Sequence, residues 1–128
     1  MPKPLQWYLK LLACLTVVSG LGQMGLPTKL GAASAWGVAP GWQREIAFWN
    51  LAIYIVIAQA LRADDAVSGR AVAIALVTLQ LLVATNHAEA AIASHAMLNV
   101  VMSAVNYSCA AFGILALRVR PAGQAPRE

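Results

Sequence analysis

Charged residues are scarce in this chain of 128 residues, where Asp, Glu, Lys and Arg together make up 11% of the sequence. Hydrophobic residues make up 60%, which is far more than in an average soluble domain. This composition excludes an ordinary soluble protein and indicates an integral membrane protein embedded in a lipid bilayer. Since each membrane span takes roughly 20 residues, the chain has room for a single transmembrane domain, residues 1–128, and for no separate soluble domain.

Sequence motifs typical of enzymes, transporters and nucleic-acid-binding proteins are also missing. The chain has no Gly-rich phosphate-binding loop, no nucleophile elbow, and no paired carboxylates or basic residues in the middle of its apolar runs. Its nine Lys and Arg residues lie at the ends of those runs and form no basic patch with interleaved aromatic residues. We therefore assign no catalytic residue, and we expect neither transport by this chain alone nor a nucleic-acid partner.

What the chain does contain is four apolar stretches flanked by Trp, Tyr, Lys and Arg, residues that favour the membrane interface. The segment 71–117 is too long for one span at ~1.5 Å per residue, so it must fold back on itself. The only polar place for that turn is near residues 87–95. The sequence thus predicts an all-α, four-helix membrane bundle with spans at about 7–25, 45–61, 71–88 and 95–117.

The basic residues are distributed unevenly between the two sides of this bundle. Seven fall on the side of the two termini and two on the other, and positively charged loops are retained in the cytoplasm. We therefore expect both termini in the cytoplasm of a bacterial cell, with a multi-pass protein in the inner membrane and an outer loop at 26–44. The seven are Lys3, Lys10, Arg62, Arg70, Arg118, Arg120 and Arg127, and the two are Lys29 and Arg44.

Only two cysteines are present, Cys14 in the first expected span and Cys109 in the last. Both should lie in the cytoplasmic half of the bundle, at similar depth. A disulfide is not expected next to a reducing compartment, and a free cysteine commonly behaves as a small buried apolar residue. We expect both to be packing residues on neighbouring helices.

The fourth span carries a stripe of polar and small residues on one face. Spacings of three and four residues keep its members within a narrow arc of a helix. The stripe consists of His95, Asn99, Ser103, Asn106, Ala110 and Gly113. Such a face suits the interior of a bundle, where it supplies either hydrogen bonds between helices or part of a binding site.

Polar residues on the other spans are expected at similar depth, toward the outer side. We weigh three interpretations of this cluster: a structural polar cap, which we favour, a pocket for a small molecule such as a quinone, and ligation of a metal or haem. The candidate ligand-binding residues are Asn50, Tyr54, His87, His95 and Asn99, and the candidate metal ligands are His87, Glu89 and His95. The candidate helix-packing residues are Gln23, Gln80, Ser103, Asn106 and Gly113.

The outer segment 26–44 is long for a hairpin connection and contains Trp36 and Trp42. We expect it to lie along the membrane interface, with one or two helical turns within residues 30–38 that cover the mouth of the bundle. A docking surface for a partner protein is the alternative, because exposed tryptophans are good anchors.

This layout resembles that of the DoxX-like and BphX-like families of small bacterial membrane proteins. The resemblance rests on the four spans, the glycine-containing first helix Val18-Ser19-Gly20-Leu21-Gly22, Pro27 and Pro40 in the outer loop, and Trp49-Asn50 early in the second span. The acidic residue that DoxX proteins place early in the second helix corresponds only roughly to Glu45 or Asn50. The resemblance implies a link to quinone-dependent or other redox membrane systems and favours an accessory role.

Together these observations predict a small polytopic membrane protein that serves as a non-catalytic accessory or assembly subunit of a larger membrane complex. The alternative is a membrane redox component that binds a quinone, haem or metal at the outer end of the bundle. The first class requires other membrane protein subunits as partners, and the second requires a bound cofactor.

Overall fold

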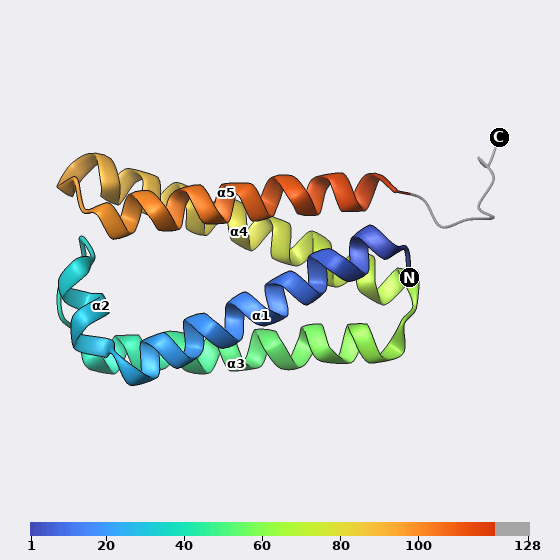
Figure 1. The fold of residues 1–128 in the computed structure, drawn as a ribbon, viewed down its shortest axis with the longest axis horizontal. Coiled ribbons are helices and arrows are strands. Elements are labelled where there is room, and N and C mark those ends of the chain that lie inside the picture. Colours follow the sequence, from blue (N-terminus) through green and yellow to red (C-terminus); the bar gives the residue numbers. More distant parts are fainter. Residues whose placement is uncertain (120–128) are drawn as a thin grey trace.

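The computed structural model describes residues 1–119, and that part of the chain is helical with short connections (Figure 1). Its helices are α1 (Lys3–Gly25), α2 (Pro27–Ala33), α3 (Pro40–Ala63), α4 (Ala66–Ser94) and α5 (Met97–Arg118). All except the short α2 are long and apolar enough to cross a membrane. The prediction of an all-α membrane protein with four spans is therefore confirmed.

Prolines and aspartates set most of the helix boundaries. α1, α2 and α3 each have a proline at the first or second helical position, where the missing N–H costs no hydrogen bond. α3 ends at Ala63 and is capped by Asp64, whose backbone is left-handed. Asp65 then caps α4 by accepting a hydrogen bond of 2.7 Å from the Ser68 N–H. Hydrogen bonding to Ser68 lowers the pKa of the Asp65 carboxyl below its ordinary value.

The turn between the last two spans lies later than the sequence predicts. α4 continues through residues 87–94, and the chain reverses at His95 and Ala96 instead of over the whole segment 87–95. The residues that extend α4 include four alanines, the strongest helix former. His95 ends the helix because it adopts a left-handed conformation (φ 57°), with its N–H bonded to the Ala91 carbonyl.

The long helices form two antiparallel pairs, α1 with α3 and α4 with α5 (Figure 1). The N-terminus and the last turn of α5 lie at one end of the bundle, which we call the terminal end. α2 lies at the opposite end, which we call the loop end, and packs against α1 and α3. The α3–α4 turn connects the two pairs at the terminal end. The α2 segment lies at the loop end.

The hydrophobic core lies toward the terminal end, where the first half of α1 meets the other three spans. Four residues of α1 spaced by three, one and three positions are fully buried there: Leu5, Tyr8, Leu9 and Leu12. They pack with Ile57 of α3, Val77 of α4 and Cys109 of α5. The Tyr8 ring meets the edge of Phe112 at a centroid distance of 5.9 Å and an angle of 88°.

The two cysteines occupy different environments. Cys109 belongs to this core, whereas Cys14 is exposed on the surface of α1, and both thiols are free. The expectation that both are buried packing residues therefore applies to Cys109 alone. Cys14 lies outside the buried series that α1 forms at every third or fourth residue.

Gly31 allows the α2 segment to fold back tightly on itself. A Cβ atom at this position would lie 2.7 Å from the Gly37 carbonyl oxygen and 2.9 Å from the Val38 Cα. Both are backbone atoms, so they cannot yield by changing a side-chain rotamer. Gly37 itself has a φ of +74°, the region that glycine adopts readily.

We expect Gly31→Ala to disrupt the α2 segment, because overpacking against backbone costs about 1–3 kcal/mol. Trypsin cleavage after Lys29, which lies in α2, should become several-fold faster in the detergent-solubilised protein. Gly41→Ala is the matched control, since a Cβ there meets nothing within 4 Å. Equal cleavage rates in the two variants would contradict the close packing described above.

Candidate functional site

The polar side chain of Asn99, near the loop end of α5, is fully buried. Its Oδ1 accepts a hydrogen bond of 2.9 Å from the backbone N–H of Ala35, in the connection after α2. Its Nδ2 lies 3.1 Å from Nδ1 of His87 on α4. Asn99 therefore joins three separate segments of the chain.

These contacts indicate which tautomer the neutral histidine ring adopts. Because the Ala35 N–H can only donate, the oxygen of the Asn99 amide must face it and the NH2 group must face His87. His87 Nδ1 is then an acceptor, and in the neutral ring the proton is on Nε2. The ring of Trp36 packs on the same imidazole, at a centroid distance of 4.9 Å and an angle of 59°.

Below Asn99, a seam of hydrogen bonds and small residues runs between α4 and α5. Ser103 Oγ donates to the carbonyl oxygen of Ala84, which is fully buried, at 3.1 Å. Asn106 Nδ2 donates to the Met102 carbonyl within its own helix. Gly113 continues the seam toward the terminal end, where Val77 and Tyr8 press against it.

The other helix pair has a polar contact of its own. Asn50 Nδ2 on α3 lies 3.2 Å from Ser19 Oγ on α1 and 3.0 Å from the Ile46 carbonyl oxygen. A Cβ at Gly20 would lie 3.5 Å from the Asn50 Cβ, which is ordinary van der Waals contact. Asn50 therefore serves the α1–α3 pair and is not part of the contact between Asn99 and His87.

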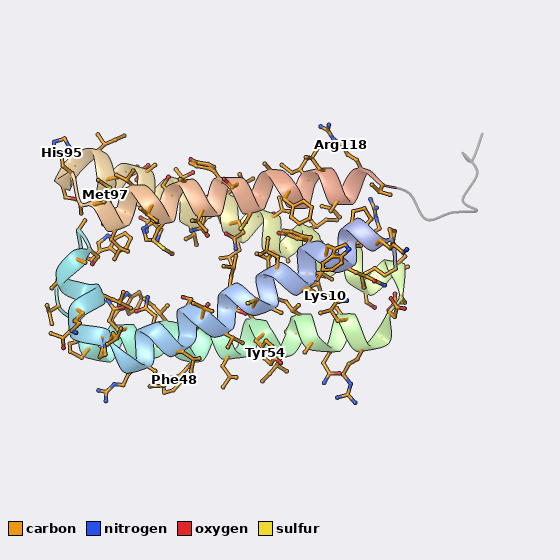
Figure 2. All side chains as sticks on the ribbon, viewed as in Figure 1. Lys10, Phe48, Tyr54, His95, Met97 and Arg118 are labelled. Carbon is orange, nitrogen blue, oxygen red and sulfur yellow. The ribbon has the colours of Figure 1, made fainter. Side chains whose placement is uncertain are left out.

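The five candidate ligand-binding residues do not gather around one cavity. His87 and Asn99 are in contact, whereas Asn50 hydrogen-bonds within the other pair. Tyr54 is exposed and points away from the α4–α5 pair, and His95 is exposed at the tip of the loop end (Figure 2). None of the five lines the groove described below.

The three candidate metal ligands are also dispersed. His87 is half-buried and bonded to Asn99, while Glu89 and His95 are both exposed. The longer α4 explains this, because it places Glu89 within a helix and His95 at that helix's C-terminal cap. Within residues 1–119, no three His, Cys, Asp or Glu side chains lie close enough together to hold a metal ion.

Two candidate packing residues, Gln23 and Gln80, are partly buried, and the Oε1 atom of each lacks a hydrogen-bond partner among the described residues. The hydroxyl group of Tyr8, whose side chain is fully buried, also lacks a hydrogen-bond partner among the described residues. Tyr8 was not among the predicted site residues. Its signal in the sequence is the spacing of Leu5, Tyr8, Leu9 and Leu12, which places all four on one face of a helix.

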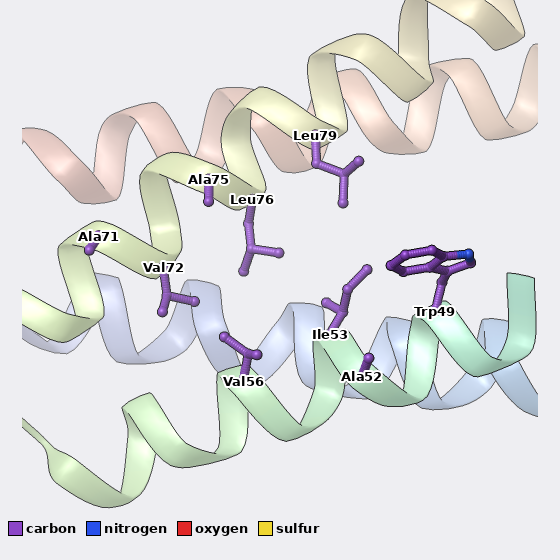
Figure 3. Close-up of a pocket in the computed structure, with 9 residues that line it drawn as sticks. All are labelled: Trp49, Ala52, Ile53, Val56, Ala71, Val72, Ala75, Leu76 and Leu79. Atoms are coloured by element: carbon purple, nitrogen blue, oxygen red, sulfur yellow. The ribbon is translucent and has the colours of Figure 1, made fainter.

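An apolar groove of ≈ 420 Å³ lies between α3 and α4, away from the polar seam (Figure 3). Trp49, Ile53 and Val56 line it from α3, and Val72, Ala75 and Leu76 line it from α4. The indole N–H of Trp49 is the only polar side-chain group in the lining, and Trp49 and Val56 are both exposed. The groove therefore opens to the surroundings of the bundle and offers them an apolar surface.

The polar seam and the groove thus have different chemistry. Asn99, Ser103 and Asn106 make hydrogen bonds within the chain, which is what helix packing in a membrane requires. The groove has free apolar surface and suits a hydrophobic occupant. No protein-family model, curated protein or solved structure significantly matches this chain.

Proposed function

We propose that the protein is a non-catalytic accessory subunit of a larger membrane complex, and that a transmembrane helix of the partner packs in the groove between α3 and α4. The observation that carries this proposal is the groove itself, which is apolar, open, and lined by two membrane-spanning helices. Ala52, Ala71 and Ala75 contribute small side chains to its surface. Small residues let helix backbones approach closely in membranes.

A helix is a suitable occupant because it needs no polar partner. In the hydrocarbon layer, a helix satisfies its own backbone hydrogen bonds and associates with its neighbours by close packing. The aliphatic walls of the groove provide such packing surface. A charged or strongly polar ligand would find in the lining only the indole N–H of Trp49.

We further propose the bacterial inner membrane as the location, with both termini in the cytoplasm and the loop end outside. The distribution of basic residues supports this orientation. Lys3, Lys10, Arg62, Arg70 and Arg118 lie toward the terminal end, against Lys29 and Arg44 toward the loop end, while Arg120 and Arg127 lie outside the described residues. The resemblance in layout to the DoxX-like and BphX-like families favours the same accessory role.

We expect Ala75→Phe, which places a ring in the groove, to reduce co-purification of the partner at least about tenfold, a loss of roughly 1.4 kcal/mol in affinity. The measurement is purification in mild detergent followed by mass spectrometry of everything that is retained. Ala104→Phe is the matched control, because Ala104 is exposed on α5 and does not line the groove. Equal loss in both variants, or no protein partner with the unmodified chain, would contradict the proposal.

A second candidate function is binding of a quinone in the same groove. A volume of ≈ 420 Å³ lies within the range of about 300–1,000 Å³ that small-molecule sites occupy, and the Trp49 N–H is available to a quinone carbonyl. Extracted quinone that disappears in Ala75→Phe and persists in Ala104→Phe would favour this function over a partner helix. Neither haem nor metal has comparable support, because His87, Glu89 and His95 do not line the groove, and within residues 1–119 no three potential metal ligands lie close together.

A further inference from the structure

The connection after α2 bridges the two helix pairs at the loop end. α2 itself packs against α1 and α3, whereas the residues that follow it contact α4 and α5. The contacts are the hydrogen bond from the Ala35 N–H to Asn99 and the packing of Trp36 on His87. We call these four residues, Ala35, Trp36, His87 and Asn99, the loop latch.

The loop latch depends on the neutral form of His87. The NH2 group of Asn99 faces the ring because its oxygen faces the Ala35 N–H. A protonated imidazole carries N–H groups on both nitrogens and has no acceptor left for that NH2 group. If the amide turned over to offer its oxygen to the ring, it would present its NH2 group to the Ala35 N–H. In either orientation, protonation leaves two donors facing each other.

We propose that His87 makes the loop latch sensitive to pH, so that protonation of its ring releases the connection after α2 from the α4–α5 pair. The docked loop requires the neutral ring, so docking weakens as the pH falls below the range in which a histidine of the released loop takes up a proton. One proton separates the two states. The ratio of released to docked loop therefore rises by up to about tenfold for each pH unit below that range.

The surroundings of His87 contain no group that would compensate for the added charge. No ion pair involves His87 among the described residues, and α5 has no charged residue before Arg118. The charged or titratable side chains at this end of the bundle are Glu89 and His95 at the end of α4, Lys29 on α2, and Arg44 and Glu45 at the start of α3, and all of them are exposed. A cation–π contact with Trp36 would strengthen docking of the protonated ring by about two- to fivefold. A buried unpaired donor weakens docking by about five- to 150-fold.

The test measures hydrogen exchange of the Ala35 amide in vesicles of phosphatidylcholine, expressed as a protection factor that removes the intrinsic pH dependence of exchange. We expect the factor to fall at least about fivefold between about pH 7.5 and about pH 5, on either side of the histidine titration. His95→Gln is the matched control: it removes the other histidine of the chain and should preserve the full decrease.

Two variants of the loop latch distinguish an effect of His87 protonation from a general loss of stability at low pH. In His87→Gln, an amide oxygen can accept from Asn99 without titrating, so protection should become independent of pH. In Asn99→Asp, one carboxylate oxygen can accept from Ala35 and the other from a protonated ring, so protection should persist or increase at low pH. A constant factor in the unmodified chain, or an equal decrease in His87→Gln, would overturn the proposal. Asn99→Asp keeps the test decisive should His87→Gln not fold.

Discussion

Replacing Gly113 with alanine is expected to lower the free energy of unfolding by about 1–3 kcal/mol, the usual cost of overpacking a close-packed interior. A Cβ at this position would lie 2.5 Å from Val77 Cγ2 and 2.6 Å from Tyr8 Cζ. The substitution therefore pushes apart α1, α4 and α5 where the two helix pairs meet. Its effect should be measured by thermal unfolding in detergent, followed by circular dichroism.

The sign of this effect is informative, because alanine normally stabilises a helix over glycine by about 0.5–1 kcal/mol. Gly25→Ala provides the control, since a Cβ there meets nothing within 4 Å, and it should be neutral or stabilising. Val77→Ala removes the nearer of the two obstructing atoms. The combination of Val77→Ala with Gly113→Ala should therefore cost less than the sum of the single substitutions. A melting temperature of Gly113→Ala equal to that of Gly25→Ala would show that the helices do not meet at this glycine.

The four spans could be predicted from the sequence because each is a long apolar run between interfacial residues, and local composition is enough to identify such runs. The ends of the spans depend on finer effects. The segment 87–95 is polar enough to predict a turn because of His87, Glu89 and His95, but its alanines keep residues 87–94 helical and move the reversal to His95. Hydropathy therefore gives the number of spans, and helix propensity and capping decide where each one ends.

The polar stripe on α5 illustrates which part of the site is accessible from sequence. Helical spacing places Asn99, Ser103 and Asn106 on one face, and the structure buries all three. Their partners could not be predicted in the same way. The groups that meet Asn99 and Ser103 include the backbone N–H of Ala35 and the carbonyl of Ala84, and every residue of a chain carries such groups. Only the packing of distant segments selects these two.

Tyr8 and the groove were missed for related reasons. Over the full length of α1, polar and apolar residues are only weakly segregated between its faces, so the short series containing Leu5 and Tyr8 does not stand out. The groove between α3 and α4 depends on how the two helix pairs separate away from the core. That separation is a property of the whole bundle, and no single span encodes it.

Replacing Asn99 with leucine should lower the free energy of unfolding by about 1–3 kcal/mol, the cost of leaving buried polar groups without partners. The new side chain is similar in size, so the loss comes from the Ala35 N–H and from His87 Nδ1. Hydrogen bonds between membrane helices are worth only about 0.6 kcal/mol on average. The larger value is expected here because one fully buried side chain makes two contacts that join three segments.

The same measurement applied to three variants tests this explanation against a general intolerance of α5 to substitution. Asn106→Leu should cost less than Asn99→Leu, because the hydrogen bond of Asn106 goes to Met102 in its own helix. Met97→Leu should change the free energy of unfolding by less than about 0.5 kcal/mol, since Met97 is 71% exposed. Equal thermal stability of all three variants would mean that Asn99 does not hold the loop end together. A loss of stability that decreases in the order Asn99→Leu, Asn106→Leu, Met97→Leu would support the contacts of Asn99 with Ala35 and His87.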